Sequence, residues 1–162
     1  MAERKVKASS PADRPTITME REFEAAPSAV FHAYSDVEAL KEWYGPDGFT
    51  ITVIAMEFRV GGLFRFIMHG PNGTDYPSRI EYREIVPAER LVYRHGSDID
   101  EDPNRFDVVV TFAPLGSDRT FLTMTSTFAS IEARDAVMQF GAVELGMQTV
   151  EKLAAYLEGE RT

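Results

Sequence analysis

Four side chains that can exchange protons or form hydrogen bonds lie on two neighbouring segments of the chain. They are one carboxylate, two phenols and one imidazole: Glu84, Tyr82, Tyr93 and His95. If these segments form a hairpin in which Val86 pairs with Leu91, all four side chains lie on one face of the sheet. Inside an apolar pocket they would orient a polar part of a ligand, and shifted pKa values would permit acid–base chemistry.

A purely structural role for the same residues stays open. Glu84 could accept a hydrogen bond from a backbone amide at a bulge, with the other three side chains at the rim of the sheet. The inward arrangement assumes a regular hairpin, and one extra residue in a strand would turn the set to the opposite face.

Other chemical motifs are missing from the sequence. There is no Gly-x-Ser-x-Gly elbow, His-Glu-x-x-His pair or phosphate-binding glycine loop, and no cysteine. Asp98, Asp100 and Asp102 have the spacing that opens a calcium loop, but Pro103 and Val109 replace the glycine and glutamate it requires. We therefore expect no metal site and no cofactor.

Composition narrows the classes of partner. The 162 residues carry a net charge of −9, which disfavours nucleic acid and anionic membrane surfaces. No run of 18 apolar residues is present, so membrane insertion is not expected. The polar start of the chain lacks the apolar stretch of a secretory signal, which favours a cytoplasmic location.

The chain is expected to form a flexible arm over residues 1–15 and a single domain over residues 16–160. Alternation predicts a first strand over 16–24, and Pro27 and Asp36 indicate the starts of two short helices. Further strands are expected over 50–58, 63–69, 76–86, 90–95, 106–112 and 120–128. An apolar stripe predicts one long helix over 131–158.

This order predicts an α+β fold. Strands joined by short links form an antiparallel sheet of about six to seven strands, whose apolar face must be covered. The C-terminal helix is the only element large enough, so a curved sheet should wrap round it. Gly141 and Gly146 inside that helix indicate close approach of a strand, space beside a ligand, or a kink.

Alternation predicts which side chains face the helix. Phe64, Phe66 and Met68 should point inward because Arg65 and His69 share the other face. Solid core packing is the better explanation for any single residue, but the number of aromatic and methionine side chains suits an adaptable apolar pocket. The expected lining is Trp43, Phe64, Phe66, Met68, Tyr82, Glu84, Tyr93, His95, Met124, Phe140 and Met147.

Four ordered motifs and one late dipeptide resemble a known family. The motifs are Ala26-Pro27-x-x-Val30-Phe31-x-Ala33, Leu40-x-x-Trp43-Tyr44-Gly45-Pro46, Arg59-Val60-Gly61-Gly62-x-Phe64-x-Phe66 and Glu84-Ile85-x-Pro87-x-Glu89-Arg90-Leu91. Over residues 16–158 the chain resembles the SRPBCC superfamily, also called START-like or birch-pollen-allergen-like. It is most similar to the branch named for activators of the heat-shock-protein-90 ATPase, although Gly146-Met147 stands where that branch usually has Gly-Trp.

The resemblance implies the helix-grip fold and commonly a ligand cavity between sheet and helix. Members of the superfamily include lipid carriers, cyclases, dehydratases and a cochaperone domain, so the resemblance does not fix an activity. Three hypotheses remain. The first is binding of a small hydrophobic or aromatic ligand without covalent chemistry, and the second is an enzyme that uses the Glu84 cluster. The third is a module that binds a chaperone through the acidic loop 97–102 and the exposed sheet face. A homodimer is a further open alternative.

Overall fold

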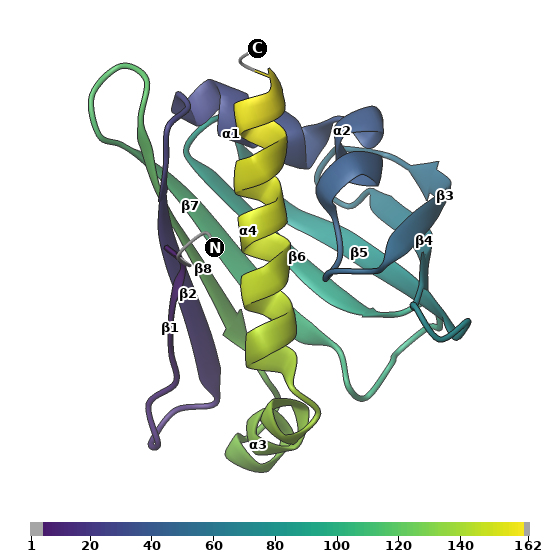
Figure 1. Ribbon diagram of the computed structural model, residues 1–162. Coiled ribbons are helices and arrows are strands. Elements are labelled where there is room, and N and C mark those ends of the chain that lie inside the picture. The colour runs from purple at the N-terminus through teal and green to yellow at the C-terminus, as the bar shows by residue number, and fades with distance from the viewer. Residues whose placement is uncertain (1–4, 161–162) are drawn as a thin grey trace.

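The computed structural model describes residues 5–160, which form one antiparallel sheet and four helices (Figure 1). The sheet has eight strands in the order β1-β2-β8-β7-β6-β5-β4-β3. The strands are β1 (Lys7–Ser9), β2 (Thr16–Phe23), β3 (Thr50–Met56), β4 (Leu63–His69), β5 (Asp75–Val86), β6 (Arg90–Ser97), β7 (Phe106–Pro114) and β8 (Thr120–Thr127). The helices are α1 (Pro27–Ser35), α2 (Val37–Trp43), α3 (Ile131–Gln139) and α4 (Ala142–Glu160).

The sheet curves around α4, which runs across its inner face (Figure 1). The helices α1 and α2 lie at one end of the sheet and α3 lies at the other. The apolar side of α4 is buried on the sheet through Val150, Leu153, Ala154 and Leu157. The predicted α+β helix-grip architecture is therefore confirmed, with one more strand than expected.

Local sequence explains the two short helices. Pro27 occupies the first turn of α1, where its missing N–H leaves no bond unmade. The carboxylate of Asp36 accepts a hydrogen bond from the amide of Ala39 at 3.0 Å and so caps α2, as predicted. The buried indole of Trp43 donates to the carbonyl oxygen of Ala33 at 3.0 Å, which ties α2 to α1.

The prediction of a flexible arm is wrong for the residues that the structure describes. Lys7–Ser9 form an edge strand that pairs with β2. The carboxylate of Glu151 on α4 accepts hydrogen bonds from the amides of Lys5 and Val6 at 2.8 and 2.9 Å. The open edge of β2, this acceptor and the buried side chain of Val6 together hold a segment that is otherwise mostly polar. Residues 1–4 of the expected arm lie outside the described residues.

The buried side chain of Arg134 holds the rest of the expected arm. Its guanidinium donates to the carbonyl oxygens of Pro11 and Arg14 at 2.7 and 2.8 Å, and to the hydroxyl of Ser10 at 2.7 Å. These hydrogen bonds satisfy backbone carbonyls that water would otherwise solvate, and they hold the turn before β2 against α3.

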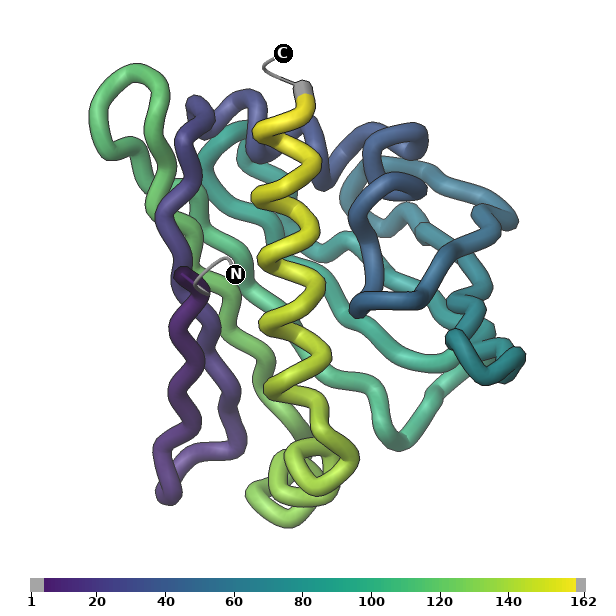
Figure 2. Tube along the Cα trace, in the orientation of Figure 1, coloured from purple at the N-terminus to yellow at the C-terminus, as the bar shows by residue number. Residues whose placement is uncertain are grey.

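The prediction of one uninterrupted C-terminal helix is also wrong. The chain turns sharply between α3 and α4 (Figure 2). Gly141 has a φ of +85°, the left-handed conformation in which glycine commonly ends a helix. Its amide donates to the carbonyl oxygen of Met138 at 3.0 Å. The kink alternative for Gly141 is therefore the correct one.

Candidate functional site

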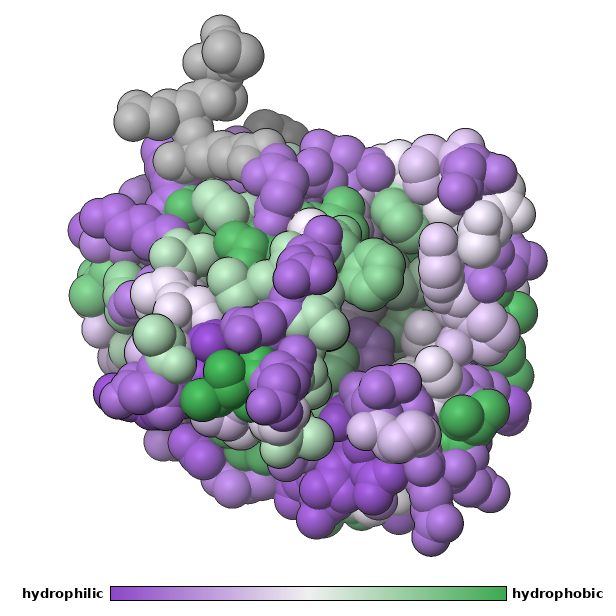
Figure 3. Space-filling view, turned by 90° about the horizontal axis from the view of Figure 1, so that it is seen from below, coloured by the Kyte–Doolittle hydropathy of each residue, from purple (hydrophilic) through white to green (hydrophobic). Residues whose placement is uncertain are grey.

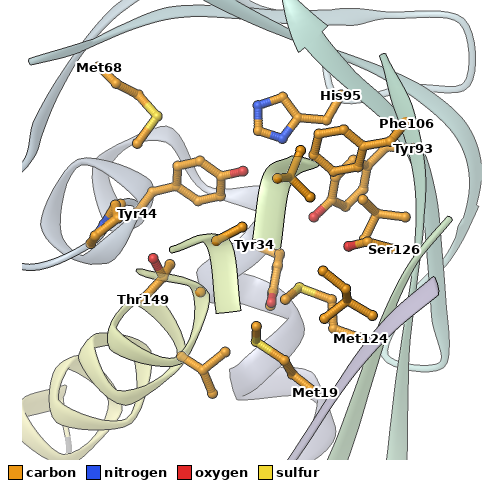
Figure 4. A pocket seen from close by; sticks show the side chains of 18 of the residues that line it. Met19, Tyr34, Tyr44, Met68, Tyr93, His95, Phe106, Met124, Ser126 and Thr149 are labelled. Atoms are coloured by element: carbon orange, nitrogen blue, oxygen red, sulfur yellow. The ribbon is translucent and has the colours of Figure 1, made fainter. Parts of the chain in front are cut away.

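A half-open cavity of about 280 Å³ lies between α4 and the sheet. Its wall is largely apolar, and Figure 3 shows the molecule hollowed on the face seen from below. Ten of the lining side chains are labelled in Figure 4. The lining residues are Ile17, Met19, Tyr34, Trp43, Tyr44, Gly45, Pro46, Met68, Tyr93, His95, Phe106, Val108, Met124, Ser126, Phe128, Val137, Ala142, Gly146, Thr149 and Val150.

The first wall comes from α1, α2 and the turn after them. The ring of Trp43 packs edge-on against Tyr34 and Tyr44, with centroid distances of 4.9 and 5.4 Å. Gly45 then adopts a φ of +115°, and a Cβ there would lie 3.2 Å from Cε of Met68. The packed indole and this glycine turn fix the phenol of Tyr44 at the edge of the cavity.

The sheet forms the second wall because alternate residues of β6, β7 and β8 face inward. Tyr93 and His95 come from β6, and Ser126 comes from β8. The imidazole of His95 packs beside the ring of Phe106 at 5.2 Å and that of Phe66 at 6.1 Å. These rings keep bulk water from most of the imidazole.

The third wall is the first part of α4, where Gly146 allows a strand to approach closely. A Cβ at Gly146 would lie 2.5 Å from Cε of Met19 on β2. Both residues also line the cavity. The glycine therefore serves close packing, as expected from the sequence, and leaves space at the cavity wall as well.

Burial keeps the titratable groups of the cavity neutral. It lowers the pKa of His95 to about 4, so the imidazole is uncharged at neutral pH. Burial likewise raises the pKa of the Tyr34, Tyr44 and Tyr93 phenols above their ordinary value. Tyr44 and Tyr34 raise the pKa of Tyr93 further, since the phenols lie close enough to interact.

These polar groups are directed into the cavity. Figure 4 shows the hydroxyl of Tyr44 and the ring of His95 extending into the space from different walls. Within residues 5–160, no side-chain hydrogen bond satisfies Tyr34, Tyr44, Tyr93 or His95. Their polar atoms are not among the fully enclosed atoms that lack a partner, so these donors and acceptors open onto the cavity and are available to a bound molecule.

Of the predicted site residues, five line the cavity and three lie beyond it in the core. Trp43, Met68, Tyr93, His95 and Met124 are lining residues. Phe64, Phe66 and Tyr82 are buried in packed core. The gap beside Phe64 and Tyr82 measures only about 10 Å³, room for about one water molecule at most. For these three residues the core-packing interpretation is correct.

The expected inward position of Glu84 is wrong. Val86 pairs with Arg90 instead of Leu91, and the register of β5 and β6 shifts between Tyr82 and Glu84. The resulting bulge turns Glu84 outward, where its carboxylate binds Arg90 at 2.9 Å and is 46% exposed. The acid–base hypothesis loses its only carboxylate and is withdrawn.

Phe140 and Met147 are not part of the cavity wall either. Phe140 is 86% exposed, because the break at Gly141 ends the helical register that would have turned it inward. Met147 is partly buried against the core, but it is not among the residues around the cavity.

The sequence analysis missed several lining residues that show a weak signal. Tyr34 follows Val30 and Ala33 on the apolar stripe of α1, and Met19 alternates with Ile17 on β2. Ser126 occupies an inward position of β8 but is small and polar, so alternation alone gave it no weight.

Two carboxylates of the acidic loop 97–102 are bound by nearby arginines and backbone amides. Asp98 accepts hydrogen bonds from Arg65 at 2.8 Å and Arg79 at 3.0 Å. Asp102 accepts from the amides of Ser97 and Asn104 at 2.8 and 3.0 Å. No metal-binding group of acidic or histidine side chains occurs among residues 5–160. Binding of a chaperone through this loop stays a prediction, and so does the formation of a homodimer.

None of the helices described by the structure combines the length and apolar character that crossing a membrane requires. No curated protein matches the chain significantly. Similar solved structures include a protein from Arthrobacter aurescens, 25% identical, with a TM-score of 0.87 and coverage of 94% of this chain and 91% of that one. A protein from Mycobacterium smegmatis is also 25% identical, with a TM-score of 0.84 and coverage of 95% and 98%.

A structure described as AHSA1 from Silicibacter pomeroyi is 24% identical, with a TM-score of 0.72 and coverage of 90% of this chain and 99% of that one. At this level of identity, the similarity shows a shared fold alone. The model of one family also matches residues 24–158, which is most of the sequence and includes every lining residue of the cavity except Ile17 and Met19. The chain therefore belongs to the family described as Activator of Hsp90 ATPase homolog 1-like protein.

Proposed function

We propose that this protein binds a small apolar or aromatic molecule in the cavity between the sheet and α4, without covalent chemistry. The proposal rests on the half-open space of about 280 Å³ and its aromatic, methionine and aliphatic wall. Small-molecule sites typically occupy roughly 300–1,000 Å³ and combine apolar walls with a few converging polar groups. A space just below the lower limit of this range favours a molecule of one or two rings.

The flexible part of the wall supports the same proposal. Met19, Met68 and Met124 come from three different strands and all line the cavity. A thioether side chain has three rotatable bonds and packs well against aromatic rings. The wall can therefore adapt to ligands that differ in shape.

A cavity-filling variant tests the proposal. Ser126→Phe places a ring in the cavity, whereas Thr123→Phe adds the same ring on the outer face of the same strand. The assay is thermal melting with a panel of one- and two-ring aromatic compounds, including 2-naphthalenemethanol. A compound at 100 times its Kd stabilises the native state by about 2.7 kcal/mol, which is readily measured.

We expect the panel to raise the melting temperature of the native protein and of Thr123→Phe but not of Ser126→Phe. The proposal is wrong if no compound shifts the melting of the native protein. It is equally wrong if a folded Ser126→Phe variant binds as tightly as the native protein, because binding would then occur elsewhere.

A further inference from the structure

The cavity wall carries no formal charge. None of the described lining residues is Asp, Glu, Lys or Arg, and burial keeps His95 neutral. Arg21, Glu151 and Lys152 are close in the chain or bonded to lining residues but do not themselves line the cavity. Arg21 binds Glu151 at 2.8 Å, and the ammonium of Lys152 donates to the carbonyl oxygen of Pro46 at 3.3 Å.

The polar groups of the wall suit a neutral partner. Each phenol donates one hydrogen bond and accepts another, and a neutral imidazole offers one donor and one acceptor. Tyr44 and His95 extend into the cavity, and Tyr93 and Ser126 add hydroxyls from the sheet (Figure 4). A hydroxyl or carbonyl group of a ligand can therefore find both kinds of partner.

A carboxylate would meet different conditions. It must leave bulk water for an apolar wall that contains no cationic side chain, and this desolvation is strongly unfavourable. The phenols would donate hydrogen bonds to it, which offsets only part of the lost hydration. A neutral oxygen-bearing ligand loses much less on entry.

We propose that the cavity selects uncharged apolar ligands that carry a hydroxyl or carbonyl group, and that it discriminates against carboxylates. This inference rests on the proposed function and names the chemical class of its ligand. The preference for neutral ligands follows from the absence of charge on the wall. The unpartnered phenols and imidazole form hydrogen bonds with the single polar group of the ligand.

Three compounds of nearly equal shape test the selection at pH 7.5: 2-naphthalenemethanol, 2-naphthoate and 2-methylnaphthalene. Their Kd values are measured by calorimetry or ligand fluorescence. The alcohol should bind at least tenfold more tightly than the carboxylate, and more tightly than the hydrocarbon. Equal or tighter binding of the carboxylate overturns the inference while leaving the proposed function intact. Failure of all three to bind overturns the proposed function itself.

A charge introduced at the rim provides the second test. Met68 lines the cavity and is only partly buried, so Met68→Lys can keep its ammonium near water while its stem covers apolar surface. Met68→Gln is the uncharged control. The lysine should raise the affinity for 2-naphthoate at least tenfold relative to the glutamine, which has a similar size at the same position but carries no charge. A folded Met68→Lys variant with unchanged affinity for the carboxylate would show that charge does not set the selection.

Discussion

The neutral imidazole of His95 makes the stability of this protein depend on pH in a defined window. Burial lowers the pKa of His95 to about 4, against about 6.5 in the unfolded chain. Between these values the unfolded state binds more protons, so the free energy of unfolding falls as the pH decreases from 6.5 to 4. The full difference corresponds to about 3 kcal/mol, an upper value because part of the ring faces the half-open cavity.

Between pH 7.5 and pH 5.0 the same pKa values predict a loss of about 2 kcal/mol through His95. The carboxylates of Asp98 and Asp102 act at lower pH. Hydrogen bonds from Arg65 lower the pKa of Asp98, and the amide of Ser97 lowers that of Asp102. Their contributions to stability are present above the ordinary carboxyl pKa and are lost only as the pH falls below it. The change in stability between pH 7.5 and 5.0 therefore reports on His95 and not on these carboxylates.

The assay is urea unfolding of the native protein and His95→Gln at pH 7.5 and 5.0, followed by the fluorescence of the single tryptophan, Trp43. The native protein should lose about 2 kcal/mol more than the variant. An NMR titration of the imidazole gives the pKa directly if the variant folds poorly. Equal losses in the two proteins, or a titration midpoint near the ordinary value, would refute the burial of His95 in a neutral wall.

Three further predictions concern a turn at the cavity edge and the two side chains that hold the N-terminal segment. Gly45→Ala should lower the free energy of unfolding by about 1–2 kcal/mol, because φ is +115° and the new Cβ would press on Met68. Chemical unfolding measures this loss, and an unchanged midpoint would contradict the prediction. Arg134→Leu leaves the carbonyl of Arg14 without this donor and that of Pro11 with only the amide of Arg14 at 3.4 Å, so hydrogen exchange of the Lys7–Ser9 amides should accelerate. Unchanged protection would show that β1 does not depend on this anchor. Glu151→Ala leaves the buried Arg21 without its carboxylate partner and should cost about 2–3 kcal/mol in urea unfolding. A loss below about 0.5 kcal/mol would contradict the pairing.

Most of the fold could be predicted because its signals are local. Alternation along the strands and the turn residues between them place β2 to β8 close to their observed limits. Pro27 and Asp36 mark the helix starts in the same way. The strand β1 could not be found, because Lys7–Ser9 is held by the edge of β2, and the two residues before it by Glu151, which is distant in sequence.

The candidate site was predicted less well because it depends on register. Tyr93 and His95 face inward as expected, but the bulge next to Tyr82 turns Glu84 out. A bulge inserts one residue without any composition signal, so alternation cannot place the residues beyond the bulge. Phe140 fits the apolar stripe as well as Val150 does, and only the left-handed conformation of Gly141 separates the two.

Methyl NMR of the methionines tests ligand binding in the cavity most directly. Met19, Met68 and Met124 line the cavity, whereas Met56, Met138 and Met147 do not. Titration with 2-naphthalenemethanol should shift the first three methyl signals strongly, through the ring current, with one common Kd, and leave the other three nearly unmoved. Shifts confined to Met56, Met138 or Met147, or no saturable shift at all, would contradict a ligand site between the sheet and α4.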